Sequence, residues 1–148
     1  MEVFESKPPA FSAEELSNIA KDCFNVLGTI KPLVSERDQN ARLINEDGEY
    51  VLKIANKAED RGLIEFQNAV LNHVALLDPS LAIPAVKQGI EGQEIFDHDG
   101  HSIRLISFLK GDIFSGAVKS ITLYYDLGRF MGRFSSAMQS FGHVKAHQ

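Results

Sequence analysis

The stretch EYVLKIANKAEDRGLIEFQN, residues 49–68, changes from a strand-like to a helix-like pattern and places one lysine inside the strand. Side chains alternate between the two faces of a strand. One face therefore carries the apolar side chains of Tyr50, Leu52 and Ile54. The other face carries Val51 and Lys53. Lys53 either faces solvent, which spacing alone favours, or points into a cleft where a carboxylate of the following helix holds it.

Residues 59–77 follow with a helical period. Apolar residues recur every three or four positions, at Leu63, Phe66, Val70, Val74 and Leu77. Asp78-Pro79 ends this helix, because the residue before a proline avoids the helical conformation. Glu65 lies on the flank of the apolar stripe, one turn into the helix, and is the favoured partner for Lys53. Glu59 is the alternative, although a carboxylate in a first turn is also explained by the helix dipole.

On the N-terminal side the sequence predicts one helix and then three strands. Ser12 and Glu15 form a capping-box pattern. Apolar residues at helical spacing then predict a helix over residues 13–24, which Gly28 ends. The strands are expected at residues 29–34, 41–45 and 50–55, joined by a polar turn at 35–40 and a tight turn at 46–48.

On the C-terminal side the pattern predicts more strands and a long helix. A short strand is expected at residues 84–87, and a hairpin is expected where residues 93–96 and 101–108 flank the turn signal DHDG. A connector at 109–112 precedes the strongest helix, residues 121–141, whose wide apolar face needs a partner. The fold class is therefore α+β, with an antiparallel sheet of about five strands and the 59–77 helix against it.

Composition excludes several classes of protein. The chain has 148 residues, of which 44% are hydrophobic and 24% charged, so it can bury a core. A net charge of −5 without clusters of Lys and Arg disfavours a nucleic-acid partner. The single cysteine, Cys23, cannot form an internal disulfide. We expect a cytoplasmic protein without a membrane partner, because the N-terminus does not resemble a signal peptide and no apolar run is long enough to span a bilayer.

Five blocks, in order along the chain, resemble one family. They are SERDQNARL, GEYVLKIAN, IEFQNAVLNHV, IRLISFLKG and LGRFMGRFSSAMQSF. Together they resemble the N-terminal lobe of the aminoglycoside phosphotransferase and choline kinase superfamily, which is kinase-like. Within that superfamily they look most like the hydroxylysine-kinase-like members, some of which are fused to class III aminotransferases. The resemblance covers residues 26–148.

The resemblance implies an ATP-binding lobe of a small-molecule kinase that phosphorylates a hydroxyl of an amine or amino alcohol. Lys53 matches the strand lysine that holds the phosphates, and Glu65 matches the helix carboxylate that orients it. Val51 matches a wall of the adenine pocket. The remaining implied ligands are the phosphate-covering turn, with Ser35, Gln39 and Asn40, and the adenine-reading hinge, with Ser107, Phe108 and Leu109.

The resemblance also implies that the chain is truncated. The family's catalytic loop has the motif His-x-Asp with an Asn five residues after the Asp, and a further Asp binds the metal. Neither has a match in these residues. The expected division is an N-terminal helical extension (1–25), the nucleotide-binding lobe (26–109), and a hinge with the first helix of a second lobe (110–148).

Three expectations follow from this division. The chain carries no catalytic or metal-binding residue of its own and is inactive alone, while the complete protein uses ATP with Mg²⁺ bound by the missing lobe. The 121–141 helix self-associates in the isolated chain, because Phe130, Phe134 and Phe141 would otherwise expose a large apolar patch. The alternative to a nucleotide-binding lobe of a kinase is a non-catalytic interaction or regulatory module with the same fold.

Overall fold

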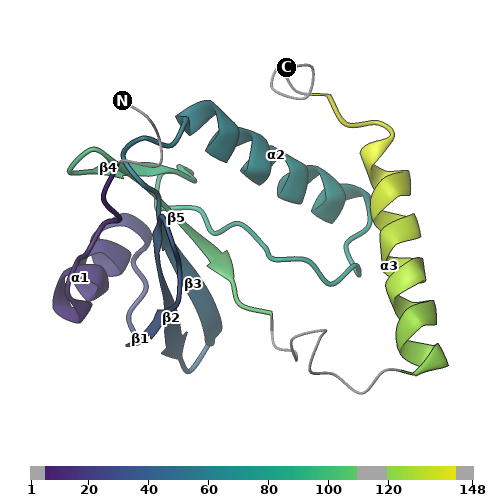
Figure 1. Ribbon diagram of the computed structural model, residues 1–148, viewed down its shortest axis with the longest axis horizontal. Helices are drawn as coiled ribbons and strands as arrows, with labels where there is room; N and C mark the ends of the chain where they lie inside the picture. The colour runs from purple at the N-terminus through teal and green to yellow at the C-terminus, as the bar shows by residue number, and fades with distance from the viewer. Residues whose placement is uncertain (1–5, 110–119, 143–148) are drawn as a thin grey trace.

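The computed structural model describes residues 6–109 and 120–142. Its elements follow one another along the chain as α1 (Ala13–Phe24), β1 (Thr29–Leu33), β2 (Gln39–Asn45), β3 (Gly48–Ile54), α2 (Arg61–Leu77), β4 (Phe96–His98), β5 (His101–Ser107) and α3 (Ile121–Met138). The strands form one antiparallel sheet in the order β1-β2-β3-β5-β4. This arrangement confirms the predicted α+β fold with one five-stranded sheet (Figure 1).

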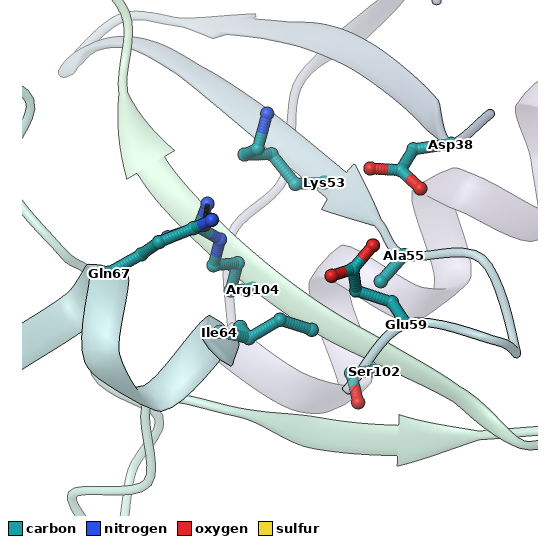
Figure 2. Close-up of a pocket in the computed structure, with 8 residues that line it drawn as sticks. All are labelled: Asp38, Lys53, Ala55, Glu59, Ile64, Gln67, Ser102 and Arg104. Atoms are coloured by element: carbon teal, nitrogen blue, oxygen red, sulfur yellow. Dashed lines mark hydrogen bonds between the residues drawn. The ribbon is translucent and has the colours of Figure 1, made fainter. Parts of the chain in front are cut away.

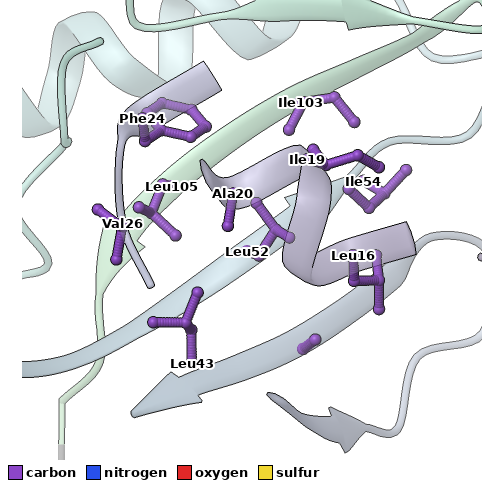
Figure 3. Packing of buried hydrophobic residues seen from close by; sticks show 11 residues of the cluster. Leu16, Ile19, Ala20, Phe24, Val26, Leu43, Leu52, Ile54, Ile103 and Leu105 are labelled. Carbon is purple, nitrogen blue, oxygen red and sulfur yellow. The ribbon is translucent and has the colours of Figure 1, made fainter. Parts of the chain in front are cut away.

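Helix α1 covers one face of the sheet and supplies four of the eleven buried residues of the main core. The Ser12 hydroxyl accepts a hydrogen bond from the Glu15 amide at 3.1 Å, and Asn25 ends the helix with a left-handed conformation. The helix turns Leu16, Ile19 and Phe24 towards the strands. They pack on alternate strand residues, as Figure 3 shows: Leu43, Leu52, Ile54, Ile103 and Leu105. Residues of α2 are not part of this hydrophobic cluster.

Leu52→Ala tests this core. Leu52 is fully buried in the central strand, where it pairs in register with Ala41 and Leu105. We expect the substitution to lower the free energy of unfolding by about 2–5 kcal/mol, because it leaves a cavity under α1. Chemical denaturation measures the change. Val34→Ala is the control, since Val34 is fully exposed; equal effects of the two substitutions would contradict the assigned core.

The hairpin turn lies later than predicted. Asp99 and Gly100 form the two-residue loop with positive φ angles of 50° and 81°, as a tight hairpin turn requires. Asp97 and His98 therefore belong to β4, which runs from 96 to 98 instead of from 93 to 96. The Asp97 carboxylate accepts a hydrogen bond from the Gly100 amide at 3.1 Å.

The predicted strand at residues 84–87 is reduced to an isolated bridge between Val86 and Ile106. The Lys87 amide donates to the Leu105 carbonyl and the Ser107 amide donates to the Ala85 carbonyl, both at 2.9 Å. This segment therefore lies along the second half of β5, beyond the point where β4 ends. Two short segments thus share one edge of β5, which explains why neither is a long strand.

Helices α2 and α3 form a second, smaller apolar cluster. Val74, Leu81 and Ala137 are buried there, and Phe130, Phe134 and Met138 pack around them. Helix α3 ends at Met138, earlier than the predicted 141. Phe141 follows in a turn and places its ring against Phe66 and His73. Among the described residues, neither these helices nor α1 is long and apolar enough to cross a membrane.

Arg133→Lys tests the attachment of α3. The Arg133 guanidinium binds both carboxylate oxygens of Asp78, with Nε donating to Oδ2 at 2.7 Å, and donates to the Ser80 hydroxyl. An ammonium cannot reproduce this two-pronged contact. We expect faster amide hydrogen exchange throughout α3 in the variant. Arg129→Lys is the control, because Arg129 lies over the Tyr125 ring at 6.0 Å instead; unchanged exchange in Arg133→Lys would contradict the role of the pair.

Candidate functional site

A polar row crosses three neighbouring strands on the face of the sheet opposite α1. Asn40 of β2, Lys53 of β3 and Arg104 of β5 are in register with one another. Their neighbours Leu52 and Leu105 point into the core, so alternation turns the three polar side chains to the other face. The predicted facing of Lys53, away from Leu52 and Ile54, agrees with this register.

A cavity of about 90 Å³ lies beside this row. The polar residues that line it are Asp38, Lys53, Glu59, Gln67, Ser102 and Arg104. Figure 2 shows the two basic side chains rising from neighbouring strands, with the carboxylates of Asp38 and Glu59 toward the other end of the cavity. Lys53 therefore lines a cavity, as its cleft-facing alternative predicted.

The cavity is a place where positive charge is poorly compensated. Burial lowers the pKa of Lys53, the positive charge of Arg104 lowers it further, and Asp38 acts in the opposite direction. Burial also lowers the pKa of Arg104, against the charge of Asp38. Within residues 6–109 and 120–142, no carboxylate lies within ion-pair distance of either group. Both cations are thus destabilised in the free protein.

Arg104 is held by helix α2. Its Nη1 donates to Asn68 Oδ1 at 2.8 Å and its Nη2 donates to Gln67 Oε1 at 2.6 Å. Only 9% of the residue is exposed. Because the main core contains no residue of α2, these amide–guanidinium bonds are a direct polar link between α2 and the sheet. The sequence prediction did not include Arg104. It could have been found because it lies between the apolar residues Ile103 and Leu105, and this alternation places it on the same face of the sheet as Lys53.

The predicted pair between Lys53 and Glu65 is wrong. The Glu65 carboxylate is half exposed and bonds Arg61, one turn earlier, at 3.3 Å. The buried face of α2 is set by Ile64 and Asn68, four residues apart. A helix rotates by about 100° per residue, so Glu65 is turned away from that face. The prediction took Leu63 and Phe66 as the inward face of α2, which placed the helix in the wrong rotation about its axis and turned Glu65 towards the sheet.

Glu59, the alternative partner, does line the cavity. It precedes the helix, whose cap is Asp60, and its carboxylate lies 3.5 Å from Arg37 Nη2. Asp38, which belongs to the predicted polar turn at 35–40 and on the sequence alone is either a turn former or a ligand, also lines the cavity. The acids that line the cavity with Lys53 therefore come from the turn before β2 and from the connection into α2.

The predicted phosphate-covering turn separates into residues with different surroundings. Ser35 is exposed. The Gln39 side chain is bound to the backbone of Phe11, accepting from its amide at 2.8 Å and donating to its carbonyl at 2.9 Å. Asn40 lies beside Lys53, and its Oδ1 is buried without a hydrogen-bond partner among the described residues. Of these three, only Asn40 shares the polar row.

Asn56 ties this turn to the end of β3. The side chain is buried, and its Nδ2 donates to three carbonyl oxygens, those of Ser6, Lys7 and Arg37, at 3.0 to 3.3 Å. Its Oδ1 accepts from the Ala58 amide at 3.0 Å. Its backbone amide donates to Asp38 Oδ1 at 2.9 Å, which fixes that carboxylate at the cavity. Sequence reasoning missed this residue, because a polar residue just after a strand resembles an ordinary turn former.

Of the predicted adenine-binding residues, Val51 lies one row further along the same face, whereas Ser107 is in register with Tyr50, which packs on the core side. Val51 is in register with Arg42 and Ile106. The Arg42 guanidinium lies 4.5 Å from the centre of the Phe108 ring and bonds Glu49. The Ser107 hydroxyl accepts from the Ala85 amide at 2.7 Å, and Leu109 is 47% exposed at the end of the described range. The remaining connector, residues 110–112, lies outside the described residues.

Comparisons with known proteins agree on one family. The profile of the "Phosphotransferase enzyme family" matches residues 29–147. The structure of the amicoumacin kinase hAmiN in complex with AMP-PNP, Ca²⁺ and Ami is similar, with a TM-score of 0.74 and 12% identity over 90% of this chain and 42% of that one. The spectinomycin phosphotransferase APH(9)-Ia, in complex with ADP and spectinomycin, has a TM-score of 0.63 and 13% identity over 92% of this chain and 43% of that one.

These likenesses fix the fold as kinase-like. No curated protein matches the chain in sequence. The chain spans less than half the length of each of the two kinases. Because the family profile covers most of the sequence, this chain belongs to the phosphotransferase enzyme family.

Proposed function

We propose that the chain is the nucleotide-binding lobe of a small-molecule phosphotransferase that acts on a hydroxyl of an amine or amino alcohol. The observation that carries the proposal is the placement of Lys53. Its ammonium lines a cavity on the sheet face opposite the core, beside a second cation and without an ion-pair partner in the described residues. A site built in this way attracts a dense negative charge. The two similar kinases were solved with AMP-PNP and ADP, which supports a nucleotide here.

The residues present fit the phosphates of ATP better than its base. A cavity of about 90 Å³ admits phosphate oxygens but not a nucleoside. ATP with a divalent cation supplies the phosphoryl group, and Lys53 would hold phosphate oxygens as a compact point charge. The base would then lie over the next row, along Val51 and Ile106 toward Ser107, Phe108 and Leu109. Asn40, with its unpartnered oxygen, would border the phosphates.

The second half of the enzyme would come from outside the lobe. Within the described residues, no three His, Cys, Asp or Glu side chains are grouped to hold a metal ion. We propose that residues 1–25 are a helical extension, that 26–109 form the lobe, and that 110–148 are the hinge and the first helix of a lobe that carries the base and the Mg²⁺ ligands. This chain covers only 42% and 43% of the lengths of the two similar kinases. Room for a second lobe in those kinases supports this division.

Nucleotide titration tests the proposal. The complete polypeptide that contains these residues and the 148-residue chain are each titrated with Mg·ATP by calorimetry. We expect saturable binding by the complete polypeptide and weaker binding by the chain alone, because half of the cleft is missing from it. Phosphorus NMR with a panel of amines and amino alcohols then reports transfer. Absence of ATP binding by the complete polypeptide would contradict the proposal.

A second candidate is an interaction module with the fold of a kinase lobe. It is favoured by apolar side chains that α3 leaves exposed: Ile121, Tyr124, Tyr125, Leu127 and Met131. Of the three phenylalanines expected to drive self-association, Phe130 and Phe134 pack in the α2–α3 cluster, and the Phe141 ring packs against Phe66 and His73. The reading frame after residue 148 separates the two candidates, since a His-x-Asp motif with an Asn five residues after the Asp belongs to an enzyme.

Self-association through α3 stays a prediction, now for different residues. Met131→Lys and Leu127→Lys should each shift sedimentation of the 148-residue chain toward the monomer, because they place a charge in the exposed apolar patch. Lys21→Glu, on the exposed side of α1, is the control. A chain that sediments as a monomer at every concentration would rule out this contact.

A further inference from the structure

We infer that Arg104 is a second phosphate-binding cation, which acts beside Lys53 and is held in place by Gln67 and Asn68 of α2. The inference rests on the proposed function and extends it, because it assigns a ligand role to a residue on β5. The ligand class is the polyphosphate chain of a nucleoside triphosphate. A nucleoside without phosphates would gain nothing from this group.

Arg104 is buried without a carboxylate partner in the part of the chain that the structure describes. Removing a charge from water costs several kcal/mol unless a close opposite charge compensates. Arg104 is 91% buried, its bonds within the described residues go to two neutral amides, and its neighbour in register is another cation. An apolar residue at this position would avoid that cost. A bound anion supplies the missing compensation.

The hydrogen-bond inventory is the second argument. A guanidinium has five donors and no acceptor, and two of those donors are engaged by α2. Asn68 must turn its oxygen to the guanidinium, so its Nδ2 is left buried without a partner among the described residues. Among the described residues, hydrogen-bond donors therefore outnumber acceptors around Arg104. A phosphate, which offers only acceptors at neutral pH, corrects this excess.

The spacing of the two cations is the third argument. Residues directly opposite each other in an antiparallel pair have Cβ atoms about 4.5–5.5 Å apart, and Lys53 and Arg104 are such a pair. Two cations at this separation can bind neighbouring oxygens of one polyphosphate chain. The planar guanidinium is suited to two-pronged contact, and the ammonium to a single oxygen.

Through Arg104, the position of helix α2 would affect phosphate binding. Glu65 points away, whereas Gln67 and Asn68 orient the guanidinium that lines the cavity. Movement of α2 would therefore move Arg104. In this chain the helix positions a cation on β5, and a bond from the helix to Lys53 is absent from the described residues.

Competition binding tests the inference in the complete polypeptide. AMP-PNP with Mg²⁺ and adenosine each displace a fluorescent ATP analogue, and the quantity measured is the ratio of the two inhibition constants. We expect Arg104→Gln to lower the preference for AMP-PNP over adenosine at least about tenfold, and Lys53→Met to do the same. Arg104→Lys keeps the charge without the fork and should lie between. Arg61→Gln, an exposed arginine of α2, should leave the ratio unchanged.

The ratio separates a ligand role from a structural one. A purely structural arginine would change both constants together, so its loss would leave the ratio unaltered. An unchanged ratio in Arg104→Gln with a reduced ratio in Lys53→Met would overturn the inference and leave the proposed function standing. A wild-type polypeptide that binds neither compound nor the fluorescent analogue would overturn both. If Arg104→Gln does not fold, an unchanged ratio in Arg104→Lys overturns the inference equally.

Discussion

Lys53→Met is expected to lower kcat/KM for phosphoryl transfer by the complete polypeptide about 10²–10³-fold, the size of effect that follows from losing one preorganised charged or hydrogen-bonding group at a developing charge. The substitution removes the ammonium and keeps an unbranched side chain of similar length. The loss should therefore be specific to catalysis and to phosphate binding, while adenosine binding is retained.

The same substitution should stabilise the free protein, by at most about 1 kcal/mol at neutral pH, because functional sites often cost stability and solvent screens part of the charge of this incompletely buried lysine. Burial and the charge of Arg104 hold the pKa of Lys53 below its ordinary value. The folded state then binds fewer protons than the unfolded state between the two pKa values. Below the folded pKa the wild-type protein bears the full penalty. As the pH rises from the folded to the unfolded pKa, that penalty is relieved, and the advantage of Lys53→Met should shrink.

Denaturation at pH 7 and at about pH 10, beside steady-state kinetics, measures both parts. Lys21→Met is the matched control, because Lys21 is an exposed lysine on α1, on the core side of the sheet. It should alter neither kinetics nor the pH dependence. Full activity in Lys53→Met would remove the basis of the nucleotide assignment, and a large loss of stability would show that the lysine is a structural residue.

The fold was predictable from local pattern because its signals are short-range. Alternation in residues 50–55 predicted Leu52 and Ile54 in the core and Lys53 on the other face of the strand. In the structure these side chains point to those faces. The Ser12 cap and the apolar spacing after it gave the bounds of α1 correctly. Each of these inferences uses contacts between residues only a few positions apart.

The site was less predictable because its contacts join distant residues. Arg104 meets Lys53 through the pairing of β3 with β5, and Asn68 through the placement of α2. Neither pairing follows from a local period. The rotation of α2 about its axis depends on which of its residues pack against the sheet. The helix was predicted correctly, but its inward face was not, so Glu65 was wrongly expected to pair with Lys53. A polar residue such as Asn56 gives no sign in the sequence of the three carbonyls that it binds.

Asn56 connects the fold to the site, because one side chain fixes both the N-terminal segment and the turn that carries Asp38. Its amide nitrogen donates to three carbonyl oxygens of the described residues. Asn56→Asp is nearly isosteric but replaces this donor by an acceptor that is charged at neutral pH. Each of these three hydrogen bonds then becomes a repulsion between oxygens in a site that water does not reach.

We therefore expect Asn56→Asp to lower the free energy of unfolding by about 3–5 kcal/mol at neutral pH, a large share of the roughly 5–15 kcal/mol that holds an ordinary domain folded. Burial and the facing carbonyls favour the protonated form of the introduced carboxyl, so its pKa should be raised in the folded state. The penalty is present above that folded pKa and is relieved as the pH falls toward the unfolded value, because the folded state then takes up a proton.

Denaturation of Asn56→Asp and wild type across pH 4.5–8 checks this sign. The stability difference between them should narrow at the acidic end, opposite to the trend for a carboxylate that is paired in the folded state. Asn18→Asp, an exposed position on α1, should show a small difference that does not narrow in this way. A penalty that is independent of pH would mean that the carboxyl escapes to solvent and that the three carbonyls are not held together by this amide. Since the same amide anchors the backbone beside Asp38, a variant that keeps its fold should also lose affinity for nucleotide, which would link the stability of the turn to the phosphate site.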